Sequence, residues 1–114
     1  KMTQNLTLKY KLWLDSNGKA FGEGPCDLLT LVEESGSLRQ AAQSMNMSYS
    51  LAHKLVKDLE GRLGFPLIAR TIGGPGGGGS TLTPEARDLL ARYNRFMEEA
   101  TREIERVYRK HFPE

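Results

Sequence analysis

The side chains best suited to binding chemistry are polar and basic residues concentrated in one short segment. They can hydrogen-bond to base edges or pair with phosphates, and they are Ser48, Tyr49, Ser50, His53, Lys54 and Lys57. On a helix, residues three or four positions apart share a face, and one helix fits the major groove of DNA. The segment therefore predicts a helical surface that contacts nucleic acid.

Catalytic chemistry is not indicated by the remaining reactive residues. The two histidines, His53 and His111, are far apart, and no serine has a base nearby in sequence. Cys26 is the single cysteine, so it forms no intrachain disulfide and no metal-ligand cluster, and we interpret it as a packing residue. We therefore expect no catalytic residues, no metal and no cofactor, and we expect the protein not to be an enzyme.

Two short helices joined by a tight turn are predicted to position the binding surface. Ser37 can cap the first helix, with Gln40 completing a capping box, and Ser48 can cap the second after a turn at Asn46. The second helix has apolar residues at helical spacing, which we expect to face inward: Leu51, Ala52, Leu55 and Leu59. This pattern is typical of a helix-turn-helix, whose second helix enters the major groove.

The N-terminal third predicts a β-hairpin over residues 5–22 and then the first helix of a three-helix unit spanning 24–63. Residues 6–14 alternate apolar and polar, as in a half-buried strand, and Asn17-Gly18 can turn the chain back. Pro25 lies where a helix start tolerates its missing N–H, and Gly36 can end that helix.

A second hairpin is predicted over residues 67–83, with a glycine-rich tip between two short strands. Such a hairpin after a helix-turn-helix is a wing that lies along the DNA backbone, where Arg70 at its base and the tip glycines Gly76 and Gly77 could contact phosphates. The glycines also match G-x-x-x-x-G, the pattern of a phosphate-binding loop in nucleotide-binding proteins. Ser80 occupies the position where that loop has its phosphate-binding lysine, and this argues against a nucleotide site. A synthetic linker would give the same GGGGS, although the flanking residues complete a plausible hairpin.

A long helix over residues 84–111 follows, because Thr83-Pro84-Glu85 is a strong helix start. Its apolar residues form one stripe at near-heptad spacing, longer than a small domain needs, and a second copy of the chain is the simplest cover. We expect the dimer interface to include Leu89, Tyr93, Phe96, Met97, Ala100 and Ile104. The alternative is that half of the stripe packs on the N-terminal hairpin.

Composition limits the class of protein. The chain has 114 residues with a net charge of +2, enough for one modest domain. Residues 37–83 contain five basic and two acidic side chains, so the positive excess, which includes Arg39, coincides with the predicted DNA-binding segment. No apolar run is long enough to cross a membrane and no signal peptide is visible, so we expect a cytoplasmic protein.

These segments together resemble the N-terminal DNA-binding domain of the ModE family of molybdate-responsive bacterial regulators, which is related to LysR-type winged helices. The similarity rests on Arg70 to Pro84, the glycine-rich wing leading into the long helix, and on Gly36 to Tyr49. It implies a mainly α fold with small β elements: a winged helix-turn-helix with an N-terminal hairpin and a long C-terminal dimerisation helix. It also implies a homodimer on a pseudo-palindromic site.

Molybdate is not expected as a ligand, because ModE proteins bind it with a C-terminal domain and this chain stops after the long helix. We predict a sequence-specific regulator of transcription, with repression favoured because a small dimer can block a promoter by occupying it. The rival hypothesis is a winged helix that serves as a protein–protein interaction module without specific DNA binding.

Overall fold

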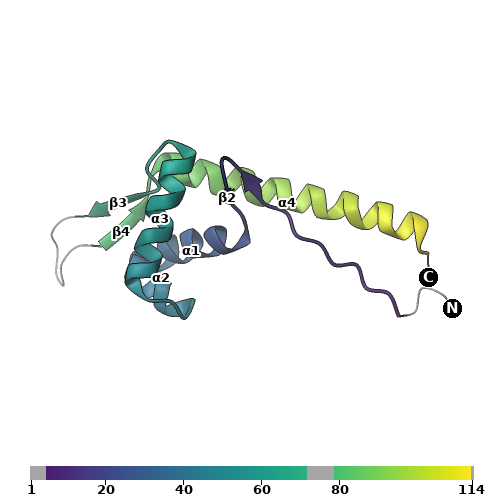
Figure 1. Cartoon of the computed structure of the whole chain (residues 1–114), viewed down its shortest axis with the longest axis horizontal. Coiled ribbons are helices and arrows are strands. Elements are labelled where there is room, and N and C mark those ends of the chain that lie inside the picture. The colour runs from purple at the N-terminus through teal and green to yellow at the C-terminus, as the bar shows by residue number, and fades with distance from the viewer. Residues whose placement is uncertain (1–4, 72–78, 114) are drawn as a thin grey trace.

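The computed structural model describes residues 5–71 and 79–113 of the chain. These residues form four helices and two small hairpins, and one helix projects far beyond the body (Figure 1). The elements in chain order are β1 (Leu14–Asp15), β2 (Lys19–Phe21), α1 (Glu23–Ser35), α2 (Leu38–Ser44), α3 (Tyr49–Leu63), β3 (Ile68–Thr71), β4 (Gly79–Leu82) and α4 (Pro84–His111). The predicted winged helix-turn-helix, mainly α with small β elements, is confirmed.

The helix starts follow from local hydrogen bonds that the sequence predicts. The Oγ atom of Ser37 accepts the backbone N–H of Gln40 at 3.1 Å, and that of Ser48 accepts the N–H of Leu51 at 3.1 Å. Each bond satisfies one of the amide groups that a helix start leaves without a partner. Asn46 has a φ of 57° in the turn between α2 and α3, a conformation that asparagine tolerates better than most residues.

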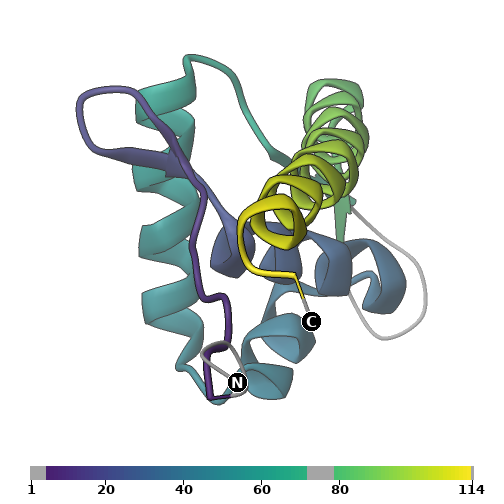
Figure 2. The same cartoon turned by 90° about the vertical axis from the view of Figure 1, so that its right-hand side faces the viewer.

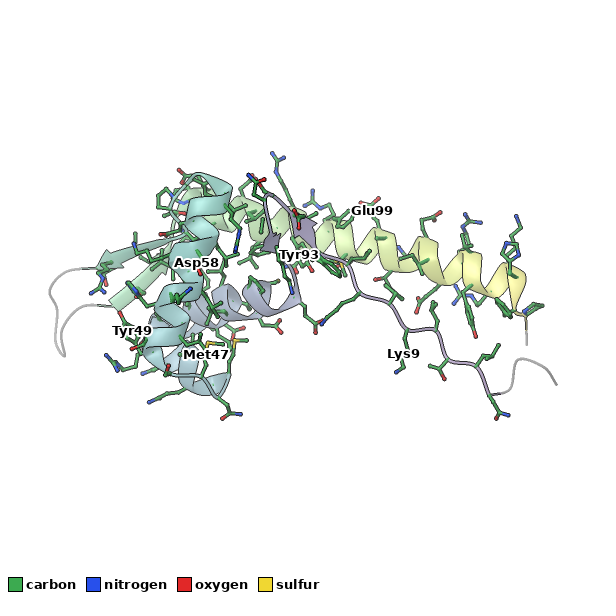
Figure 3. The ribbon with its side chains drawn as sticks, viewed as in Figure 1. Lys9, Met47, Tyr49, Asp58, Tyr93 and Glu99 are labelled. Carbon is green, nitrogen blue, oxygen red and sulfur yellow. The ribbon has the colours of Figure 1, made fainter. Side chains whose placement is uncertain are left out.

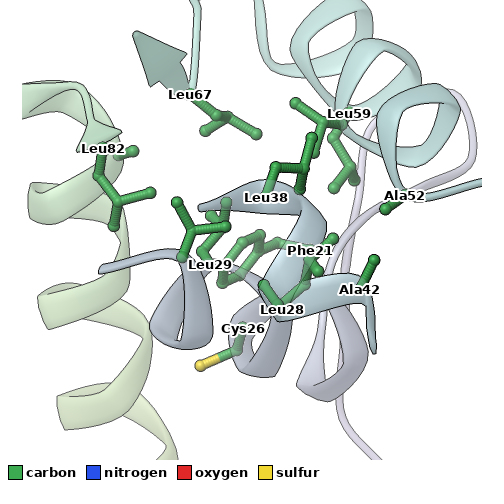
Figure 4. Packing of buried hydrophobic residues seen from close by; sticks show 14 of the residues in the cluster. Phe21, Cys26, Leu28, Leu29, Leu38, Ala42, Ala52, Leu59, Leu67 and Leu82 are labelled. Carbon is green, nitrogen blue, oxygen red and sulfur yellow. The ribbon is translucent and has the colours of Figure 1, made fainter. Parts of the chain in front are cut away.

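The core lies where α1, α2 and α3 meet the base of the second hairpin (Figure 4). Its largest fully buried side chains are Phe21, Leu28, Leu29, Val32 and Leu67. Burying each such side chain contributes roughly 1.5–3 kcal/mol. Ala41 and Ala42, with 0% and 1% of their surface exposed, let α2 approach its neighbours closely.

Helix α3 is rotated relative to our sequence-based prediction. Leu51 and Leu55 were expected to face inward, but they are 46% and 39% exposed. The side that packs on the core carries Ala52 and Leu59, as predicted, together with Val56. Leu51 and Leu55, like Ala52 and Val56, have helical spacing, so the pattern alone does not choose between them. The small Ala52, which is fully buried, lets α3 pack closely on this side.

The second hairpin pairs β3 with β4 in antiparallel register, Ile68 opposite Leu82 and Thr71 opposite Gly79. Its far end is held by the turn after α1, because the backbone N–H of Ser80 donates to the carbonyl oxygen of Gly36 at 2.8 Å. Its near end is held by Thr83, whose hydroxyl donates to the carbonyl oxygen of Pro66 at 2.7 Å. The hairpin is thus fixed to the helical body at both ends, and the predicted wing strands are present.

The N-terminal strand is shorter than predicted. Only Leu14 and Asp15 pair with β2, whereas residues 6–13 are extended without belonging to a ladder. We call residues 6–13 the arm. Period-two alternation indicates an extended backbone, but it does not supply a neighbouring strand, and this explains why the predicted pairing is wrong here.

Helix α4 gives the chain an elongated shape. The molecule measures 62 × 27 × 21 Å and its radius of gyration is 17.7 Å, whereas a compact domain of this length has about 13 Å. The arm and the second half of α4 project from the body in the same direction (Figures 1 and 2). Among the described residues, none of the helices is apolar enough over a sufficient length to cross a bilayer.

Candidate nucleic-acid interface

The exposed face of α3 carries the polar residues that the sequence singled out. Ser50, Lys54 and Lys57 follow one another at four- and three-residue spacing, opposite the buried side of the helix. All three are exposed, and α3 has no acidic residue in its first turn. This face can offer hydrogen-bond donors and positive charge to a groove of DNA.

Tyr49 links three elements at the start of α3 (labelled in Figure 3). The guanidinium carbon of Arg39, from α2, lies 4.5 Å from the centre of the Tyr49 ring. The Nη2 atom of Arg70, from β3, donates to the Tyr49 hydroxyl at 3.1 Å. Tyr49 therefore holds two arginines, from the helix-turn-helix and from the wing, beside the exposed face of α3.

A cavity of about 190 Å³ separates this end of α3 from the wing. Its polar lining comes from Tyr49, His53, Lys57, Glu60, Arg70 and Ser80. The ring of His53 lies 6.0 Å from that of Tyr49, at a tilted angle. The cavity thus brings together residues that are up to 42 positions apart in the chain, Leu38 and Ser80.

Two ion pairs restrain the lysines of α3. Lys54 Nζ lies 2.9 Å from an oxygen of Asp58, and Lys57 Nζ lies 3.5 Å from Glu60 Oε1. The hydrogen bond from Lys54 lowers the pKa of Asp58. Both lysine side chains are largely exposed, 72% and 63%, so these pairs are weak and leave the lysines accessible to phosphates.

Glu60 is a residue whose role the sequence analysis missed. Its Oε2 atom accepts the backbone N–H of Leu67 at 2.7 Å and that of Ile68 at 3.4 Å. The side chain is 14% exposed. Glu60 therefore fixes the first residues of the wing to α3, and no local sequence pattern indicates this role because the bond spans a chain reversal.

The predicted DNA-binding residues do not all converge. Arg39, Tyr49, His53, Lys57 and Arg70 gather around the cavity or the Tyr49 ring, while Ser50 and Lys54 lie on the outer face of α3. The Ser48 hydroxyl is engaged as a helix cap. Gly76 and Gly77 lie outside the described residues.

The predicted interface residues of α4 differ in exposure. Phe96 is 47% exposed, and Leu89, Met97, Ala100 and Ile104 are partly buried along the same helix. Tyr93 does not fit that prediction, because it is only 4% exposed within its own chain. Its ring packs edge-on against Phe21 at 5.0 Å, so it belongs to the core of the monomer.

Cys26 lies beside Tyr93 at the junction of α1 and α4. Its Sγ donates to Oδ1 of Asn94 at 3.5 Å, and burial raises the pKa of the thiol. A thiol with a raised pKa is a poor nucleophile at neutral pH, which agrees with a packing role. Within the described residues, no group of three or more histidine, cysteine, aspartate or glutamate side chains could hold a metal ion.

Comparison with known proteins gives consistent matches over the helix-turn-helix. Residues 27–87 match the family described as bacterial regulatory helix-turn-helix protein, lysR family. The chain is 32% identical over 80 residues to the molybdenum-pterin-binding protein MopB of Rhodobacter capsulatus, covering 70% of this chain and 30% of that protein. It is 36% identical over 67 residues to the transcriptional regulator ModE of Haemophilus influenzae, covering 59% of this chain and 26% of that protein.

The fold also matches a solved structure. A crystal structure of a CbnR_DBD–DNA complex superposes with a TM-score of 0.55 at 23% identity, over 75% of this chain and 93% of that one. The chain spans about a third or less of the length of the curated relatives that it matches.

Proposed function

The chain belongs to the LysR family of bacterial regulatory helix-turn-helix proteins, and we propose that it regulates transcription by binding duplex DNA in a sequence-dependent manner. The observation that carries the proposal is the convergence of Arg39, Tyr49 and Arg70 beside the exposed face of α3. Three elements thus present hydrogen-bond donors and charge to one side of the molecule. The name of the relative in Haemophilus influenzae, a transcriptional regulator, supports the same role.

We assign different roles to the residues of this surface. Lys57 and Arg70 line the cavity between α3 and the wing, and Arg39 lies over the ring of Tyr49, which also lines it. A phosphate of the DNA backbone would meet several donors there. Ser50, His53 and Lys54 lie on or near the outer face of α3, where side chains reach base edges. Lys54 can also add affinity through phosphates. Sequence preference would then depend on α3 and overall affinity on the surrounding cations.

Two exposed ion pairs of similar geometry provide a matched test. Lys54 and Asp58 on α3, and Asp88 and Arg92 on α4, each lie four residues apart with an N–O distance of 2.9 Å. Lys54→Ala and Arg92→Ala remove the same charge and the same kind of pair, which is worth about 0.3–0.5 kcal/mol. Only Lys54 lies on the proposed DNA surface.

The experiment is fluorescence anisotropy with a genomic duplex and a random duplex across a salt series. We expect Lys54→Ala to weaken binding and to reduce the slope of log K against log salt by about 0.9 for each phosphate that the protein no longer neutralises. Arg92→Ala should bind as the unmodified protein does. Equal effects of the two substitutions would contradict the proposal, and no binding at low salt would favour a protein-interaction module instead.

We also propose that the protein acts as a homodimer through α4. Phe96 and Val107 are 47% and 45% exposed, and the radius of gyration of 17.7 Å leaves much of α4 without cover from its own chain. Large exposed apolar side chains on one helix favour association. Sedimentation velocity should give a dimer that Phe96→Asp converts to a monomer, whereas Glu98→Ala, on another face of α4, should leave it dimeric.

A dimer would place two copies of α3 on a pseudo-palindromic site. Occupying a promoter in this way blocks other proteins, so we propose repression, which transcription in vitro from a promoter containing the selected site would test. Because bacterial DNA lies in the cytoplasm, we infer that the protein works there.

A further inference from the structure

The arm makes almost no hydrogen bonds to the rest of the described chain. Its one bond of this kind joins the Tyr108 hydroxyl to the carbonyl oxygen of Leu6 at 3.5 Å, and residues 7–12 make none within the described ranges. An extended segment with both backbone edges free is a template for pairing with another strand. The unpaired backbone of the arm is therefore available to a partner strand.

Apolar side chains of the arm also lack cover. Leu6 is 50% exposed, Tyr10 41% and Trp13 51%, while Leu8 and Leu12 are partly buried. Leu6, Leu8, Tyr10 and Leu12 alternate with Thr7, Lys9 and Lys11, so they share one face of an extended chain. A solvated linker has no need of this alternation, whereas a strand with one buried face requires it.

The position of the arm relative to α4 indicates its partner. Both project from the body in the same direction, and the Tyr108–Leu6 contact holds the start of the arm near the end of α4 (Figures 1 and 2). If α4 forms the interface of the homodimer that we propose above, the arm follows that interface along its length. A segment that passes a two-fold axis at about a right angle lies beside the same segment of the second copy, in antiparallel orientation.

We propose that the arms of two copies pair as an antiparallel β-ribbon across the two-fold axis of the dimer. This inference rests on the proposed function for the existence of the dimer. The ribbon satisfies the free backbone groups of residues 6–13 and gathers the apolar faces of both arms on one side. It thereby adds a second layer to the α4 interface.

Charge restricts which residue can lie on the axis. An axis at Lys9 or Lys11 places each lysine opposite its own copy, and an axis at Tyr10 places Lys9 opposite Lys11. Like charges directly opposite one another destabilise a strand pair. An axis at Leu8 pairs Lys9 with Thr7, and an axis at Leu12 pairs Lys9 with Asp15, so these two registers are favoured.

Disulfide trapping of single-cysteine variants tests the ribbon. Cys26→Ser removes the native thiol and keeps a donor for Asn94, and each variant then carries Leu8→Cys, Lys9→Cys, Tyr10→Cys or Leu12→Cys. Only a residue on the axis faces its own copy within the roughly 4.4–6.8 Å between Cα atoms that a disulfide needs. We expect cross-linking of Leu8→Cys or Leu12→Cys to be about tenfold faster than that of Lys9→Cys or Tyr10→Cys.

Amide hydrogen exchange on the unmodified protein gives an independent readout. Residues 7–12 should be protected roughly a hundredfold at concentrations where the protein is dimeric. A protein that dimerises and binds DNA, but whose arm is unprotected or cross-links equally slowly at all four positions, would overturn the ribbon and leave the proposed function intact. A monomeric protein would overturn the ribbon and the proposed dimer together, and DNA anisotropy would separately report on DNA binding.

Discussion

Two glycines, one in the wing and one in α3, should change the stability of the protein in opposite directions when each is replaced by alanine. Gly79 begins β4, and a Cβ atom added there would lie 2.8 Å from the carbonyl oxygen of Gly36 and 3.2 Å from Thr71 Oγ1. Gly61 lies inside α3, and a Cβ atom added there would meet nothing within 4 Å. Neither position has a positive φ, so packing and helix propensity decide the outcome.

The magnitudes follow from these contacts. At Gly79 the wing must move away from Gly36, which strains or breaks the 2.8 Å hydrogen bond from Ser80. Overpacking costs about 1–3 kcal/mol and breaking a hydrogen bond about 0.5–1.5 kcal/mol, so the less costly of the two sets the destabilisation at roughly 0.5–1.5 kcal/mol. Gly61→Ala should instead stabilise the protein by about 0.5–1 kcal/mol, because glycine is a poor residue inside a helix.

Urea unfolding of both variants measures the difference in the free energy of unfolding, at one protein concentration because the protein is proposed to dimerise. Hydrogen exchange at the Ser80 amide shows whether the destabilisation results from loss of its hydrogen bond to Gly36 at the wing. In Gly79→Ala we expect that amide to lose protection and DNA affinity to fall. Equal signs for the two variants, or a Gly79→Ala protein with unchanged stability and Ser80 protection, would refute the reasoning.

Three further predictions concern contacts within the body. Glu60→Ala leaves the amide of the fully buried Leu67 without its 2.7 Å acceptor, which should cost about 1–3 kcal/mol in urea unfolding, whereas the exposed Asp58→Ala should cost far less. Tyr49→Phe removes the hydroxyl that accepts from Arg70 but no charge, so DNA affinity should fall about two- to tenfold with an unchanged salt slope; a changed slope would contradict this. Because burial raises the pKa of Cys26, the folded state keeps its proton when the unfolded thiol loses it, so stability should fall as pH rises above about 9. Cys26→Ala should reduce that fall, as stability curves at several pH values will show.

Local signals in the sequence predicted the elements well. The caps Ser37, Ser48 and Thr83 each accept the expected backbone N–H, and α4 begins at Pro84 as predicted. These features depend on interactions between residues that are close in sequence, so they can be predicted from the local sequence alone. The glycine at position 36 likewise ends α1 with a φ of 72°.

Features that depend on tertiary contacts were harder to predict. Helical spacing correctly placed Ala52 and Leu59 of α3 in the core, but it put Leu51 and Leu55 there in place of Val56, because the choice depends on how closely another helix approaches. The same spacing placed Tyr93 on a dimer interface, although its ring fills a space beside Phe21. When two faces of a helix are equally apolar, the elements that pack against the helix decide which face is buried. The spacing of apolar residues within the helix does not identify those elements.

The candidate site likewise combines features that the local sequence predicts with contacts that depend on the tertiary fold. Residue type and spacing predicted the exposed polar face of α3, but the contacts that Tyr49 makes with Arg39 and Arg70 cross ten and 21 positions in the chain. Likewise, nothing in the sequence distinguishes Glu60 from an ordinary charged surface residue, whereas in the structure it accepts a hydrogen bond from the amide of Leu67. These roles depend on which elements meet, and they became visible only with the fold.

The bond between Ser80 and Gly36 has a consequence for how this protein could diversify. It joins two backbone groups, so the direction in which the wing leaves the body does not depend on the side chains of either residue. Insertions, deletions or substitutions between Thr71 and Gly79 can therefore accumulate while the base of the wing stays in place. Descendants of this chain could therefore vary those residues without reorienting β3 and β4, provided that Gly79 remains glycine.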